Sequence, residues 1–187
     1  MGSATATTMA ISAASANQLD QLIFIAGIVT RSARFCVQSY NAPVQREPDP
    51  GRTFACQVRV YYEDVDIGGV VYYANYLRYF ERARSDWLLS LGVNQERMAA
   101  VEGIGFVVAR AEIDFRVGAR LDDLLEVTVK LVDKKKTYFW LEQEARLAGG
   151  PHSGRLCAAA RIQAACVRHK DMRPQPIPEI LATRLAA

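Results

Sequence analysis

The sequence predicts an α+β domain in which a curved, five-stranded antiparallel sheet wraps one long helix. Two observations support this: a helical apolar stripe follows a first strand, and four further strands come after the helix. One long helix that precedes consecutive antiparallel strands buries its apolar side by lying across one face of a curled sheet. Half of the 187 residues are apolar and 23% are charged, which excludes an intrinsically disordered chain.

The first predicted strand covers residues 54–60, where apolar and polar side chains alternate. Acids and two glycines interrupt the pattern over residues 63–69. A helix is predicted from Tyr73 to Leu91, because apolar residues recur there at spacings of three, four and seven. Gly92 stands where a left-handed C-terminal cap is expected.

The remaining pattern is that of strands, with a turn at each break. Three prolines then end the regular structure, and a short helix is predicted over residues 179–185. The four later strands are predicted at residues 105–115, 125–131, 138–147 and 156–169.

Three segments are expected. Residues 1–50 are predicted to be a disordered extension, because residues 1–15 are almost all small and bury little area, and the apolar run at residues 22–29 is only eight residues long. Residues 51–173 form the folded domain, and residues 174–187 form a C-terminal tail with the short helix. No apolar run approaches the roughly 20 residues that a membrane-spanning helix needs, so a soluble protein without a membrane span is expected.

Charge and cysteine usage narrow the function classes. The formal net charge of +3 is too small to indicate a nucleic-acid-binding face. The four cysteines show no metal-ligand spacing and only two histidines are present, so no metal or redox cofactor is expected. Buried, reduced cysteines in a cytoplasmic protein are the simplest interpretation.

The residues suited to chemistry lie in the segment 62–76, where a strand ends, acids and glycines follow, and a helix begins. The first turn of a helix leaves its N–H groups unpaired and carries partial positive charge, so it can polarise a thioester carbonyl. A carboxylate beside it could attack the carbonyl or activate a water. The competing interpretation is that Asp64 and Asp66 only cap the helix.

The segment VRVYYEDVDIGGVVYYANYLRYFERARSDWL resembles the signature of the hotdog-fold acyl-CoA thioesterases of the 4-hydroxybenzoyl-CoA thioesterase class. It is especially similar to the bacterial branch associated with the Tol-Pal envelope system. The resemblance implies a hotdog fold, dimers with a continuous sheet, and often tetramers. It also implies that Asp66 is the catalytic carboxylate and that the backbone N–H of Tyr73 polarises the thioester.

Two features leave alternatives open. Many members of the Tol-Pal-associated branch have a histidine where this sequence has Tyr73, so an imidazole is missing while the backbone amide is kept. Glu81 is an alternative catalytic acid, because some hotdog thioesterases place the acid on the long helix. An ion pair of Glu81 with Arg78 or Arg84 is the simpler explanation for it.

Two groups of residues are predicted to bind substrate. The first is Gly68, Gly69 and Val70, where the glycines give the acyl-thioester room. The second is Lys134, Lys135, Lys136 and Thr137, since a compact lysine run can pair with the phosphates of coenzyme A. The alternative for the lysines is an ordinary solvated turn.

The predicted function is hydrolysis of acyl-CoA to a free acid and coenzyme A by a homodimer or homotetramer. The alternative is a non-hydrolytic module that binds an acyl carrier protein or an envelope-associated partner through the same groove. A hotdog dehydratase ranks below both, because it needs a histidine that the motif does not offer.

Overall fold

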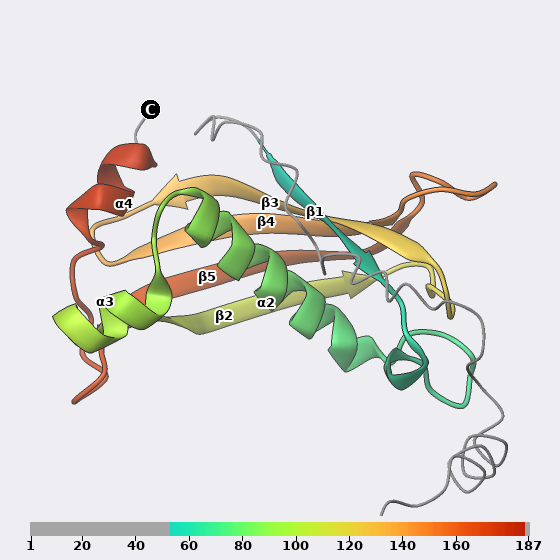
Figure 1. Cartoon of the computed structure of the whole chain (residues 1–187), viewed down its shortest axis with the longest axis horizontal. Helices are drawn as coiled ribbons and strands as arrows, with labels where there is room; N and C mark the ends of the chain where they lie inside the picture. Colours follow the sequence, from blue (N-terminus) through green and yellow to red (C-terminus); the bar gives the residue numbers. More distant parts are fainter. Residues whose placement is uncertain (1–52, 186–187) are drawn as a thin grey trace, which may run out of the picture. The chain divides into compact units, whose positions relative to one another are not determined.

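The computed structural model describes residues 53–185, and the extension predicted at residues 1–50 lies outside them. The described chain is a five-stranded antiparallel sheet with the long helix α2 across one face (Figure 1). The elements are β1 (Phe54–Arg59), the 3-10 turn η1 (Tyr62–Asp64), α2 (Tyr73–Ser90), α3 (Gln95–Glu102), β2 (Ile104–Phe115), β3 (Leu124–Lys134), β4 (Tyr138–Leu147), β5 (Leu156–Arg168) and α4 (Glu179–Arg184).

The strands are ordered β1-β3-β4-β5-β2, and each neighbouring pair is antiparallel. β1 and β2 are therefore the two edges of the sheet. The last residue of β1, Arg59, pairs with the first residue of β3, Leu124. This register places the loop after β1 at one end of the sheet and the β3–β4 turn at the other end.

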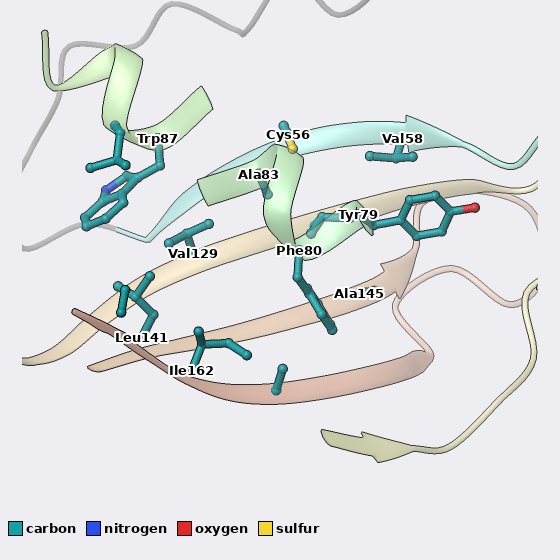
Figure 2. Close-up of a cluster of buried hydrophobic side chains, with 14 of the residues drawn as sticks. Cys56, Val58, Tyr79, Phe80, Ala83, Trp87, Val129, Leu141, Ala145 and Ile162 are labelled. Carbon is teal, nitrogen blue, oxygen red and sulfur yellow. The ribbon is translucent and has the colours of Figure 1, made fainter. Parts of the chain in front are cut away.

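The core lies between α2 and the sheet, as Figure 2 shows for part of it. The buried helix stripe runs through Tyr76, Phe80, Ala83 and Trp87, at spacings of four, three and four residues. The predicted strands are confirmed, and the face of β4 that begins at Phe139 is buried at every second residue.

The predicted helix is confirmed, but its buried face is rotated from the expected one. Tyr73 and Leu77, predicted to face the core, are 59% and 42% exposed, whereas Tyr79 is fully buried. The difference arises because the helical spacing of apolar residues also includes side chains at the two edges of the apolar stripe. Only the position of the sheet decides which of these edges is buried.

Gly92 ends the helix as predicted, with a φ of 73°. The next helix, α3, was not predicted, because Met98 is its only buried residue and the apolar pattern is correspondingly weak. Its ends nevertheless carry local signals. The Asn94 side chain accepts a hydrogen bond from the N–H of Arg97, and Gly103 adopts a left-handed conformation.

The predicted C-terminal helix is present as α4, and it packs into the core through the fully buried Leu181. The three cysteines within the described residues, Cys56, Cys157 and Cys166, are buried and free, which agrees with the interpretation from sequence.

Candidate active site

A tight backbone turn presents the predicted catalytic acid. The N–H of Asp66 donates to the Val70 carbonyl at 3.0 Å, and the N–H of Gly69 donates to the Asp66 carbonyl at 2.9 Å. Gly69 has a φ of 71°, a conformation that side chains disfavour. The loop therefore holds residues 66–69 at its tip, immediately before α2.

Asp64, the first acid of the motif, anchors this loop. Its buried side chain accepts a hydrogen bond from the N–H of Tyr61 at 2.9 Å. Its carbonyl accepts from the N–H of Tyr72 at 2.8 Å and from the Asn75 side chain at 3.0 Å. Burial, followed by the nearby Asp64 carboxyl, raises the pKa of Tyr79. Asp64 thus ties the end of β1 to the start of α2.

A second segment supports the loop from behind. The N–H of Val71 donates to the Ala119 carbonyl at 2.8 Å, and the N–H of Ala119 donates to the Tyr76 hydroxyl at 3.2 Å. Gly118 lies so close to Val70 that a Cβ built on the glycine would stand 2.7 Å from Val70 Cγ1. Sequence reasoning missed Asp64, Asn75 and Gly118 as supports, because only the fold brings them together.

Asp66 has an exposed carboxylate, and its Oδ1 accepts a hydrogen bond from the N–H of Gly68 at 2.7 Å. It does not cap α2, since among the described residues its carboxylate accepts a hydrogen bond from Gly68 and from no amide of the helix. The capping interpretation is therefore wrong for Asp66. In the first turn, the N–H of Asn75 donates to the Tyr72 carbonyl at 2.8 Å. The N–H of Tyr73 has no acceptor among the described residues, so it can face a ligand.

A β-bridge between Val65 and Val71 brings Asp66 near the start of α2. The pKa of Tyr72 is raised, first by a hydrogen bond with the Tyr73 side chain and further by the charge of Asp66. The Tyr73 ring is exposed and packs edge-on against Phe115 of β2, with 6.1 Å between ring centroids. An acid, a helix N-terminus and an aromatic surface thus lie at the same end of the sheet.

A cavity of about 120 Å³ lies further along α2, between that helix and the sheet, and neither Asp66 nor Tyr73 lines it. Its lining residues are Glu81, Arg84, Ser85, Trp87, Leu88, Gln95, Phe106, Val107, Val108, Phe139, Leu141 and Ala164.

Glu81 lies on the wall of this cavity with an exposed side chain. It accepts a hydrogen bond from the Ser85 hydroxyl at 2.8 Å. Within residues 53–185 it forms no ion pair with Arg78 or Arg84, so the expected ion pair is not present. Besides Asp66 in the loop, Glu81 on α2 thus offers a carboxylate that is exposed to solvent.

The lysine run lies at the β3–β4 turn. Lys134 Nζ donates to the Ala182 carbonyl of α4 at 2.7 Å, and Lys135 forms an ion pair with Asp133 at 3.2 Å. Lys136 is exposed. Lys134 stands ten residues after Leu124, about 33 Å along an extended strand, so a single chain does not bring the lysines beside Asp66.

Two negative findings concern the described residues. No group of three or more His, Cys, Asp or Glu side chains there is arranged to hold a metal ion. None of the helices in residues 53–185 combines the length and apolar character that crossing a membrane requires.

Comparisons with known proteins identify the family. A family model described as the thioesterase-like superfamily matches residues 60–185. The chain belongs to this superfamily. The thioesterase is 38% identical over 126 residues to acyl-CoA thioesterase YbgC of Haemophilus influenzae, and the match covers 67% of this chain and 89% of that protein. It is 35% identical to acyl-CoA thioester hydrolase YbgC of Escherichia coli O157:H7, with coverage of 67% and 90%.

Similarity to solved structures supports the same family. The 1,4-dihydroxy-2-naphthoyl-CoA thioesterase from Synechocystis superposes with a TM-score of 0.66 at 26% identity, covering 72% of this chain and 96% of that one. A probable thioesterase from Bartonella henselae has a TM-score of 0.62 at 33% identity, with coverage of 68% and 100%. The predicted hotdog fold and the predicted thioester hydrolase class are confirmed by these matches.

Proposed function

We propose that this thioesterase hydrolyses acyl-CoA with Asp66 as its catalytic acid and the Tyr73 amide as the group that polarises the carbonyl. The observation that carries the proposal is the uncapped N-terminus of α2 beside an exposed carboxylate. Partial positive charge at a helix N-terminus stabilises the oxyanion that develops when a thioester carbonyl is attacked.

Two routes are compatible with this arrangement. In the first, Asp66 attacks the carbonyl carbon, the carbon–sulfur bond breaks, and water then hydrolyses the resulting anhydride. In the second, Asp66 accepts a proton from a water molecule while that water attacks the carbonyl. In both routes coenzyme A leaves as a thiolate that takes up a proton, and no metal or redox cofactor participates.

Gly68, Gly69 and Val70 are proposed to border the thioester. The Gly68 amide already donates to Asp66, so it holds one carboxylate oxygen in place. Oδ2 accepts no hydrogen bond from the described residues, which suits a nucleophile or base. The Tyr73 side chain, which stands where the related branch often has histidine, is proposed to contact the acyl group rather than to transfer a proton.

The decisive test compares Asp66→Asn with Glu81→Gln, since both replace an acid by an amide of the same size. Loss of a positioned catalytic acid typically costs about 10²–10⁴-fold in rate. We expect kcat for acyl-CoA hydrolysis to fall by at least a hundredfold in D66N, with KM little changed. If E81Q loses that much and D66N does not, Glu81 is the catalytic acid and the proposal is wrong.

We also propose that one substrate is bound by two copies of the chain. Asp66 and the lysine run lie at opposite ends of the sheet, and β2 is an edge strand with exposed Val108 and Phe115. An exposed apolar edge strand is prone to pair with another chain. Lys135, Lys136 and Thr137 of one copy would then meet the coenzyme A whose thioester lies at Asp66 of the other.

Complementation between inactive variants tests this arrangement. D66N and a Lys135→Ala/Lys136→Ala variant are each expected to be weak enzymes. After co-refolding, mixed dimers have one site with both functions intact, so activity above the sum of the two parents is expected. Activity equal to that sum would show that the acid and the lysines act within one chain. Light scattering reports whether dimers or tetramers form.

The finer family assignment also stands as a proposal. The resemblance supports the Tol-Pal-associated branch, and an acyl carrier protein is proposed as an alternative acyl donor. The free, buried cysteines support a cytoplasmic location. A panel of short, long and aromatic acyl-CoAs, run beside acyl carrier protein thioesters, measures the preferred donor. Absence of turnover with every donor, together with capture of acyl carrier protein, would favour the binding-module alternative.

A further inference from the structure

Arg84 is a half-buried cation on the wall of the cavity between α2 and the sheet. The surrounding wall is largely apolar and includes Trp87, Phe106 and Phe139. A charge in such surroundings is costly unless it is paired or hydrogen-bonded. Burial accordingly lowers the pKa of Arg84.

A buried glutamine holds the guanidinium. Arg84 Nη1 donates to Gln143 Oε1 at 2.8 Å, and Gln143 Nε2 donates to the Phe80 carbonyl at 3.0 Å. Gln143 is only 1% exposed, so its amide can be satisfied in this orientation alone. The sheet therefore fixes the place of the Arg84 charge.

Most of the donors of Arg84 are not used by the described residues. A guanidinium has five N–H donors, and the bond to Gln143 uses one of them. The charge of Glu81 raises the pKa of Arg84, an effect smaller than that of burial. Glu81 accepts a hydrogen bond from Ser85 and forms no ion pair with Arg84. The cavity wall thus offers hydrogen-bond donors to an occupant.

Two exposed apolar side chains of α2, Tyr73 and Leu77, lie between the helix start and this cavity. Tyr73, Leu77 and Arg84 lie on one side of α2, at spacings of four and seven residues. On β2, Phe115 contacts Tyr73 and Val108 lines the cavity. Eleven residues of helix separate Tyr73 from Arg84, about 16 Å.

A bulge in β2 lies beside the cavity. The pairing of β2 with β5 shifts between Val108 and Arg110, so the strand bends where it meets the cavity wall. Bulges are common next to binding sites because they re-aim side chains.

We propose that the cavity receives the far end of a medium-chain acyl group, and that Arg84 selects acyl groups with an oxygen acceptor at that end. This inference rests on the proposed function, because it starts from a thioester held at Tyr73. A hydrocarbon end leaves the guanidinium donors unpaired, whereas a hydroxyl or carboxylate oxygen accepts from them.

The test compares kcat/KM for acetyl-CoA, decanoyl-CoA, ω-hydroxydecanoyl-CoA and the mono-CoA ester of decanedioic acid. The variants are Arg84→Met, which keeps length without donors, and Arg82→Met, an exposed matched control on the same helix. We expect the parent to favour an oxygenated ten-carbon acyl group over decanoyl by about tenfold, the value of a hydrogen bond to a charged group. R84M should abolish that ratio and R82M should keep it.

Ratios within one variant cancel differences in folded fraction. Preference for the ω-hydroxy substrate would show that Arg84 binds a neutral acceptor, as expected if the Glu81 charge repels a second carboxylate. Preference for the dicarboxylic substrate would show that Arg84 forms an ion pair with it. Equal ratios in the parent and R84M, with acetyl-CoA hydrolysed, would overturn this inference alone. Failure of the parent to hydrolyse any acyl-CoA would instead overturn the proposed function.

Discussion

Replacing Gly118 with alanine should displace the loop that presents Asp66, although Gly118 is neither in the motif nor near it in sequence. The added Cβ would stand 2.7 Å from Val70 Cγ1 and 2.9 Å from Val70 Cβ. Rotation of the valine side chain relieves only the first contact, because Cβ is fixed to the backbone. The loop backbone must therefore move.

The expected cost follows from overpacking. Forcing extra carbon into a tight contact costs about 1–3 kcal/mol, while Gly→Ala gains about 0.4–1 kcal/mol by restricting the unfolded chain. A net loss of about 1–2 kcal/mol is expected in G118A, which lowers Tm by roughly 3–8 °C. Because a misplacement of 1 Å can cost about a hundredfold in rate, a smaller loop shift should lower kcat by roughly tenfold.

A double-mutant cycle isolates the contact. Urea unfolding and acyl-CoA hydrolysis are measured for the parent, G118A, Val70→Gly and the double variant. Removal of the Val70 side chain makes room for the new Cβ, so the double variant should be more stable than the sum of the single losses by about 1–2 kcal/mol. Additive losses, or a G118A variant as stable and active as the parent, would refute the close packing of these two loops.

Two further predictions concern the lysine run and the buried thiols. Lys134→Ala should lower stability by about 1 kcal/mol, because it removes the bond to the Ala182 carbonyl. Lys136→Ala should leave the urea midpoint unchanged and raise KM for acyl-CoA more at low salt than at high salt. The reverse pattern would contradict both assignments. Burial raises the pKa of Cys56 from 9.0 to about 12 and that of Cys166 to about 11. These thiols stay protonated in the folded chain while the unfolded chain ionises above about pH 9, so the urea midpoint should fall from pH 9 towards pH 12. A Cys56→Ala/Cys166→Ala variant should show a shallower fall, and an equally steep one would assign the effect elsewhere.

Much of the fold could be predicted because local patterns report it directly. The alternation in β1 and β4, and the spacing of Tyr76, Phe80 and Ala83, follow from one side of each element being buried. Gly92 was identifiable because few residues other than glycine suit its φ. By contrast, α3 buries little and left a weak pattern.

Some residues of the candidate site could likewise be predicted from the sequence, and others could not. Asp66 and Tyr73 could be proposed from sequence, because a helix N-terminus, an acid and glycines are adjacent in the chain. The supports of the loop could not, since Gly118 meets Val70 only through the packing of separate segments. Helix spacing also could not predict that Arg84 would form its hydrogen bond with Gln143 rather than an ion pair with Glu81.

The sequence by itself determined the strands, the long helix and the position of the acid before it, because backbone preference and side-chain periodicity are local properties. Only the tertiary structure decided that Asp64 anchors the loop, that Arg84 faces an apolar cavity, and that the lysine run lies at the opposite end of the sheet from Asp66. These facts depend on strand register and on which elements pack together, and both are set by contacts between residues far apart in the chain.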